Sequence, residues 1–163
     1  MNYFELFDIP ISLKVDKASL SKKYFELQKK YHPDFFTQSD ESEQQEALDK
    51  SSLINKALKT LQNQDETIKY VLQQKQLLEE EEKYTLPPDF LMEMLELNEA
   101  VMEEEPAAVT QKIEAVETEL YGEVKDIIDT YKDSVTTSEQ LLRVKEYYYK
   151  KKYLQRILDR IDG

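Results

Sequence analysis

The chain has 163 residues and a formal net charge of −12, with one histidine, two glycines and no cysteine. Thiolate and histidine-cluster metal sites are therefore excluded, and we expect neither a metal nor a cofactor. Residues 1–75 carry 11 basic and 12 acidic side chains, whereas residues 76–163 carry 11 and 22, so the second half would repel nucleic acid and anionic membranes and suit a basic protein partner.

The sequence is rich in helix formers and poor in turn residues, which predicts an all-α protein. A short first element is expected over residues 3–8, before Pro10. Asp16 is a plausible N-cap for a helix that runs to about residue 31, where Pro33 disfavours further helix. The apolar side chains of this helix recur at helical spacing: Leu20, Tyr24, Leu27 and Tyr31.

A loop is expected over residues 34–38, and Ser39 or Asp40 can cap the next helix. The register that we predict for that helix aligns Leu48, Ser52, Asn55 and Leu58, with Ile54 and Leu61 alongside. Asn63 and Asp65 indicate a break. A further helix should then bury Ile68, Val71 and Leu72.

The pair Pro87-Pro88 marks the clearest boundary, because prolines are tolerated at a helix start but not inside a helix. Three helices are expected after it, over about 88–104, over about 107–132 and from a Thr137–Gln140 capping box onward. Short connections between amphipathic helices predict an antiparallel three-helix bundle. The predicted domains are residues 1–75, a linker over 76–86 and the bundle over 87–163.

The tripeptide His32-Pro33-Asp34 (HPD) lies between two predicted helices. Taken alone it is usually a turn, but its surroundings add Tyr3-Phe4-x-Leu6-Phe7 before it and Ile54-Asn55-x-Ala57-x-x-x-Leu61 after it. With these motifs, roughly the first 75 residues resemble the J-domain family. The resemblance implies an antiparallel helical hairpin that presents HPD at its tip and stimulates ATP hydrolysis by an Hsp70-type chaperone.

Four lysines precede the HPD tripeptide on the same predicted helix. Lys22 and Lys29 are seven residues apart, as are Lys23 and Lys30, so that each pair lies on nearly one side of a helix. Such rows are often only a solvated face. Beside a J-domain motif, however, the lysines become candidates for steering an acidic partner surface, together with His32, Pro33 and Asp34.

The predicted helix over 88–104 has more apolar residues than one buried face requires. At about 100° per residue, the first row holds Phe90, Met94, Leu97 and Val101, and the second holds Leu91, Leu95 and Met102. A third row holds Met92, Glu96, Glu99 and Glu103. The second row is either buried like the first or is an exposed docking face with an acidic rim, and periodicity alone favours neither.

The string Phe90-Leu91-Met92-Glu93-Met94-Leu95-Glu96-Leu97 after a J-domain resembles the HscB-type co-chaperones of iron–sulfur cluster assembly. The resemblance implies a bundle that binds an IscU-like scaffold protein and brings it to an HscA-like Hsp70. The scaffold-contacting candidates that it implies are Leu91, Met92, Leu95, Glu96, Glu99, Glu103 and, on the last helix, Tyr153.

The sequence departs from the family pattern at two places. Phe35 follows HPD where a lysine is common, which removes one cationic contact. Residues 64–67 replace the Pro and Arg that precede the last J-domain helix, which puts the docking of that helix in doubt. We expect no catalytic residue, because His32 has no second histidine, cysteine or serine motif as a partner.

Other functions are compatible with parts of the sequence. The alternatives are a J-domain protein for a different client, a structural helical adaptor without an Hsp70 partner, and a hydrolase with a metal bound by carboxylates. Tyr147–Tyr149 followed by Lys150–Lys152 superficially indicates nucleic-acid binding, but consecutive residues fan out around a helix. Without a membrane-spanning apolar run or a signal-like start, a soluble protein of a reducing cytoplasm is the simplest interpretation. Because His32 has no catalytic partner, we expect the protein not to be an enzyme.

Overall fold

The computed structural model describes residues 2–162, which form helices and connecting segments and contain no strand. The predicted all-α class is therefore confirmed. The chain divides into two compact units, one that extends to Val71 and one that begins at Leu72. This division falls within a helix rather than at the predicted linker. The functional assignment of residues 1–75, 76–86 and 87–163 as domains stays a prediction.

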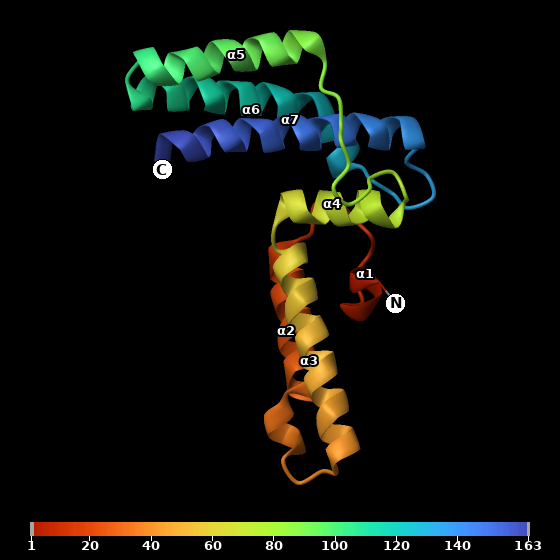
Figure 1. Ribbon diagram of the computed structural model, residues 1–163. Helices are drawn as coiled ribbons and strands as arrows, with labels where there is room; N and C mark the ends of the chain where they lie inside the picture. Colours follow the sequence, from red (N-terminus) through yellow and green to blue (C-terminus); the bar gives the residue numbers. More distant parts are fainter. Residues whose placement is uncertain (1, 163) are drawn as a thin grey trace. The chain divides into compact units, whose positions relative to one another are not determined.

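The first unit is built around a helical hairpin. Helices α2 and α3 lie side by side and run in opposite directions (Figure 1). The short α1 packs against α3, and the 3₁₀ helix η1 joins the two arms of the hairpin. The bounds are α1 Tyr3–Leu6, α2 Lys17–Tyr31, η1 Pro33–Phe36, α3 Glu41–Leu61 and α4 Gln64–Gln74.

Capping side chains fix the N-terminal ends of both hairpin helices. The Asp16 carboxylate accepts the Ser19 N–H at 2.9 Å, which confirms it as the α2 N-cap and lowers its pKa. Asp40 accepts the Glu43 N–H at 2.8 Å and caps α3. The predicted loop over 34–38 was wrong in part, because Pro33 fixes a helical φ at the first position of η1.

The predicted row of α3 was wrong by one residue, although Ile54 and Leu61, which were placed alongside it, are buried. Leu48, Ser52 and Asn55 are exposed, and the buried side chains are Ala47, Ser51, Ile54, Ala57 and Leu61. Three of these buried side chains are small, Ala47, Ser51 and Ala57, and hydrophobicity alone does not rank them above Leu48. Asn55 instead accepts a hydrogen bond from the Tyr24 hydroxyl at 3.0 Å, which links α3 to α2.

Two helix ends have left-handed residues that are not glycine. Asp8 (φ 53°) follows α1, and Gln76 (φ 60°) follows α4. After each, the chain closes back on its helix: the Ile9 N–H bonds to the Phe4 carbonyl, and the Leu77 N–H bonds to the Leu72 carbonyl. These are Schellman-type ends, which glycine usually marks in a sequence. The first element therefore ends at Leu6, two residues before its predicted end.

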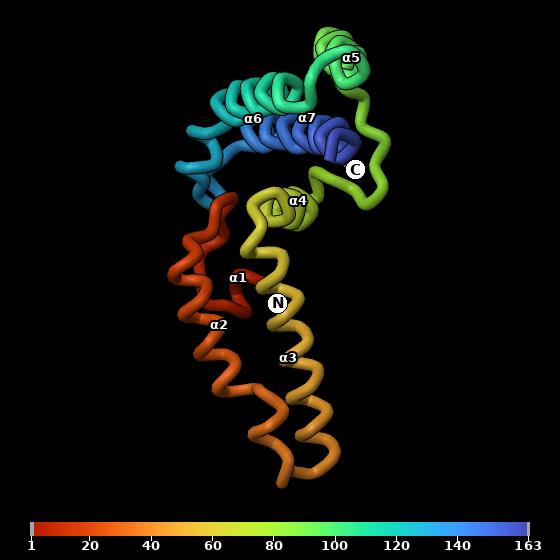
Figure 2. The backbone as a smooth tube through the Cα atoms, turned by 90° about the vertical axis from the view of Figure 1, so that its left-hand side faces the viewer, coloured from red at the N-terminus to blue at the C-terminus, as the bar shows by residue number. Residues whose placement is uncertain are grey.

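The second unit contains a three-helix bundle. Helices α5 (Pro88–Glu103), α6 (Pro106–Asp129) and α7 (Ser138–Asp162) lie side by side (Figures 1 and 2). Their ends fall within about three residues of the predicted ones. The capping box is confirmed, since the Gln140 N–H donates to Thr137 Oγ1 at 3.2 Å and the Thr137 N–H donates to Gln140 Oε1 at 2.9 Å.

The segment between α4 and α5 is attached to α7. The Glu82 carboxylate lies 2.6 Å from the Lys145 ammonium, and the Tyr84 ring stacks on Tyr149 with 4.5 Å between centroids. The neighbouring Tyr147 and Tyr148 are buried in the bundle. Consecutive tyrosines of α7 thus point in different directions, and they form no shared stacking platform.

Replacing Glu82 with glutamine should make stability less dependent on pH. The hydrogen bond from Lys145 holds the pKa of Glu82 below its ordinary value, so the folded state favours the charged carboxylate. The ion pair therefore stabilises the native protein above about pH 4.5, and this contribution is lost as pH falls through the lower folded-state pKa. At pH 7 we expect a loss of about 1 kcal/mol in the free energy of urea unfolding, and a smaller loss at pH 3.

The matched control for this prediction is Glu114→Gln, which removes an exposed carboxylate from α6. We expect it to leave the unfolding free energy nearly unchanged at both pH values. If Glu82→Gln lowered the unfolding free energy equally at pH 7 and at pH 3, the electrostatic explanation would be contradicted.

Replacing Gly122 with alanine should stabilise the second unit. Gly122 lies inside α6, and a Cβ built there meets nothing within 4 Å. Because no close helix contact requires glycine, the reduced backbone entropy of unfolded alanine should add about 0.5 to 1 kcal/mol to the unfolding free energy. Thermal unfolding measures the change, and a lower midpoint for the variant would contradict it.

Candidate functional site

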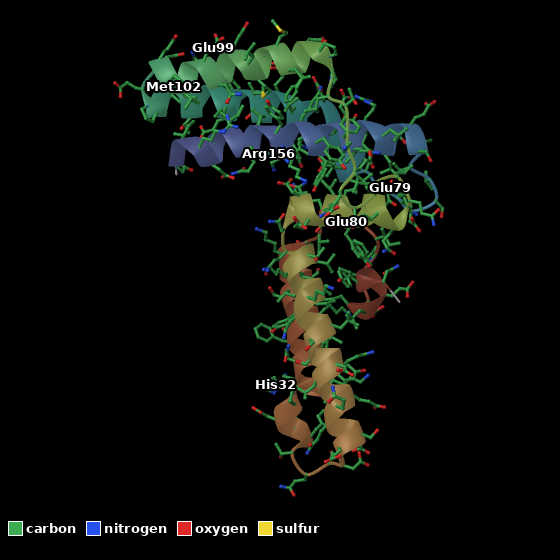
Figure 3. The ribbon with its side chains drawn as sticks, in the orientation of Figure 1. His32, Glu79, Glu80, Glu99, Met102 and Arg156 are labelled. Atoms are coloured by element: carbon green, nitrogen blue, oxygen red, sulfur yellow. The ribbon has the colours of Figure 1, made fainter. Side chains whose placement is uncertain are left out.

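The HPD tripeptide forms an exposed corner between α2 and η1, in the segment that Figure 3 labels at His32. His32 is the C-cap of α2, and its extended backbone turns the chain out of the helix. The Asp34 N–H donates to His32 Nδ1 at 3.2 Å, which orients the imidazole. The side chains of His32 and Asp34 are 44% and 85% exposed, so both are accessible to a partner protein.

The lysines of α2 differ in how they are engaged. Lys23 lies 3.5 Å from the Asp8 carboxylate, and the Lys30 ammonium lies 5.3 Å from the centre of the Tyr31 ring. Lys22 and Lys29 are exposed, and neither has an ion pair within the part of the chain that the structure describes. The row formed by Lys22 and Lys29 therefore carries the charge that is most available to a partner.

Two exposed aromatic residues, Phe25 and Phe35, lie beside this surface. The sequence patterns did not predict that either would be exposed. Phe25 lies between Lys22 and Lys29 on the same side of α2, three residues from one and four from the other. Phe35 is also exposed, and its ring meets the His32 ring edge-on at 6.2 Å. The departure at Phe35 thus exchanges a charge for an apolar contact beside the HPD corner.

Helix α5 has one buried side and one exposed side. Phe90, Met94 and Leu97 are buried in the bundle, together with Ala100, while Val101 is partly buried. Leu91 and Leu95 are 41% and 52% exposed, so the second row of the helix is not part of the core. The second row is therefore not buried like the first, and its role as a docking face stays a prediction.

The exposed side of α5 combines apolar and acidic side chains. We call it the α5 face; it comprises Leu91, Met92, Leu95, Glu96, Glu99 and Glu103, all of them exposed. Figure 3 labels Glu99 and also Met102, which extends the apolar row toward the end of the helix. An apolar centre with a charged border is the composition of many protein-docking surfaces.

Tyr153 comes from α7 and reaches the edge of the α5 face. Its ring meets the buried Phe90 ring edge-on at 6.2 Å, and its side chain lines a groove that Leu91 also lines. The structure therefore brings Tyr153 beside Leu91, one of the α5 residues with which it was grouped. These two residues are more than 60 positions apart in the sequence.

Shifted pKa values occur at contacts outside these surfaces. The hydrogen bond between Lys75 and Asp133 raises the pKa of the amine and lowers the pKa of the carboxyl. Burial raises the pKa of Tyr84 and of Tyr149 in their stacked pair. These groups stabilise local structure, so they indicate no reaction centre.

Residues 2–162 contain no group of three or more His, Cys, Asp or Glu side chains arranged to hold a metal ion. Within the same range, none of the helices has the length and apolar character needed to cross a membrane.

Comparisons with known proteins agree over nearly the whole chain. A family model described as the HSCB C-terminal oligomerisation domain matches residues 86–162. A co-chaperone protein HscB homolog from Photobacterium profundum is 32% identical over 143 residues, covering 87% of this chain and 80% of the relative. The homolog from Acinetobacter baumannii is 32% identical over 162 residues, covering 99% and 89%.

Solved structures of HscB proteins are also similar to this chain. The crystal structure of human co-chaperone protein HscB has a TM-score of 0.83 and 28% identity, covering 99% of this chain and 81% of that one. Chaperone HscB from Vibrio cholerae has a TM-score of 0.74 and 26% identity, covering 99% and 96%. This chain, with its helical hairpin and its three-helix bundle, belongs to the HscB family of co-chaperones.

Proposed function

We propose that this protein stimulates the ATPase of an HscA-like Hsp70 chaperone and delivers an IscU-like iron–sulfur scaffold protein to it. The observation that carries the proposal is the exposure of His32 and Asp34 beside the Lys22–Lys29 row. The proposal includes a cytoplasmic location. It assigns the chain no catalytic residue and no resident cofactor.

The HPD corner and the lysines of α2 form the proposed Hsp70-binding surface, which comprises Lys22, Lys23, Lys29, Lys30, His32, Pro33 and Asp34. Lysine charge increases the rate of encounter with an acidic partner surface. Pro33 begins η1 and restricts the backbone, which lowers the conformational entropy lost on docking. Asp34 is exposed enough to accept a charge-assisted hydrogen bond from a partner arginine.

The α5 face, with Tyr153 at its edge, is the proposed scaffold-binding surface. Leu91 and Leu95 supply apolar area that binding would remove from water, at roughly 25 cal/mol per Å². The carboxylates Glu96, Glu99 and Glu103 supply the charged border, which selects a partner with basic residues at matching positions.

The experiment that tests the proposal is the steady-state ATPase rate of the HscA-like chaperone, measured alone, with this protein, and with this protein plus the scaffold. We expect each addition to raise the rate. A rate that this protein leaves unchanged would favour a structural adaptor without Hsp70 coupling. Stimulation by the protein with no further effect of the scaffold, and no scaffold binding, would favour a different client.

A further inference from the structure

A groove of about 500 Å³ lies between α7 and the segment that precedes α5, within the second unit. Its lining comprises residues 82–86, Leu91, Tyr149, Lys152, Tyr153 and Arg156. The Glu82–Lys145 ion pair and the Tyr84–Tyr149 stack hold the segment against α7. The walls of the groove are thus formed by packed side chains before any partner arrives, which lowers the cost of binding.

Three cations line this groove: Lys83, Lys152 and Arg156. Among the residues that the structure describes, no carboxylate lies within ion-pair distance of any of them. Other cations of α7 are engaged, since Lys145 pairs with Glu82 and Lys150 pairs with Glu146. Residues 76–163 contain twice as many carboxylates as cations, so unpaired positive charge gathered at one groove is a distinct local feature.

The one carboxylate in the groove lining does not cancel this charge. Glu82 is only 20% exposed, and its charge is paired with the Lys145 ammonium, which lies outside the lining. Lys152 and Arg156 lie four residues apart on α7, so their side chains project from the same side of the helix. Figure 3 labels Arg156 on α7.

The groove is continuous with the α5 face, because Leu91 belongs to both and Tyr153 lines the groove at the edge of that face. At about 100° per residue, Leu91 and Leu95 lie nearest the groove, and Glu99 and Glu103 lie farther around α5. The surface therefore changes from cations on α7, through exposed leucines, to carboxylates on α5. A partner docked on the leucines would extend over both charged edges.

From this arrangement we propose that the groove binds an acidic segment of the same protein that docks on the α5 face. The inference rests on the proposed scaffold-binding function and assigns it a second contact of opposite charge. Arg156 can hold a carboxylate through two parallel N–H donors, and Lys152 adds a compact second charge. Opposite charges at the two edges fix the direction in which the partner lies, which a uniformly acidic surface cannot do.

The test measures the affinity of the IscU-like scaffold for the full chain as a function of salt. The variant Lys152→Ala with Arg156→Ala should bind about tenfold more weakly at low salt, mainly through slower association. It should also show a smaller dependence of log Kd on log salt concentration. The double variant Lys59→Ala with Lys132→Ala removes two exposed positive charges outside the groove and should match the native protein. Circular dichroism confirms that each variant is folded.

Each outcome distinguishes this inference from the function on which it rests. Native protein that binds no scaffold would overturn both. Suppose that the Leu91→Ala/Leu95→Ala variant loses scaffold binding, while the Lys152→Ala/Arg156→Ala variant keeps native affinity and native salt dependence. That result would overturn the proposed role of the groove alone. Capture of a single-stranded oligonucleotide through Lys152 and Arg156, with scaffold binding unchanged, would also overturn it.

Discussion

Replacing His32 with glutamine should reduce stimulation of the Hsp70 ATPase by about 30-fold or more. The imidazole is partly exposed, and its Nδ1 accepts a hydrogen bond from the Asp34 N–H, so its replacement disturbs little within the molecule. A side chain at the centre of a small interface typically contributes at least about 2 kcal/mol, which corresponds to that factor. The measurement is the steady-state ATPase rate as a function of added protein.

The control for His32→Gln is Gln38→Ala, because Gln38 is exposed and lies just after the 3₁₀ helix η1. It alters the same connection between α2 and α3 without touching the HPD corner, so we expect native stimulation. Thermal unfolding should give nearly the same midpoint for both variants as for the native protein. Equal stimulation by His32→Gln and by native protein would contradict the proposed role of the corner.

Replacing Leu91 and Leu95 together with alanine should weaken scaffold binding by at least about 30-fold, because the two side chains form the apolar centre of the α5 face. Both are substantially exposed, so their truncation should change the unfolding free energy by no more than about 0.5 kcal/mol each. Isothermal titration calorimetry measures the binding, and circular dichroism with thermal unfolding measures the fold.

Leu142→Ala is the matched control, because Leu142 is a leucine of similar exposure on α7, 47%, that lies outside the α5 face and the groove. It should retain native affinity. A loss of thermal stability in the Leu91/Leu95 variant parallel to its loss of affinity would show instead that these leucines hold the bundle together.

Local signals in the sequence predicted the elements that depend on local chemistry. Local chemistry determines three of these features: the Asp16 cap, the end of α2 before Pro33 and the Thr137–Gln140 capping box. Each depends only on residues a few positions apart in the sequence. The long bundle helices were predicted equally well, because their apolar residues recur over many turns.

The errors occurred where a partner helix or an uncommon residue decides the structure. In α3 the buried row contains Ala47, Ser51 and Ala57, which hydrophobicity ranks below the exposed Leu48. Which positions of α3 become buried depends on the helices that pack against it, and that is not visible in the residues of α3 alone. Asp8 and Gln76 adopt the left-handed conformation after a helix, which glycine usually adopts. Because neither residue is glycine, the sequence did not indicate these helix ends.

The sequence by itself determined the all-α class, the HPD tripeptide between two helices and the amphipathic pattern of the bundle, because these follow from residue types and short spacings. Only the tertiary structure decided which row of α5 stays exposed, and only it brought Tyr153 and Arg156 beside Leu91. Periodicity assigns residues to sides of a helix. Which side becomes buried depends on how many neighbouring helices cover it, and that is settled only when segments distant in the chain pack together.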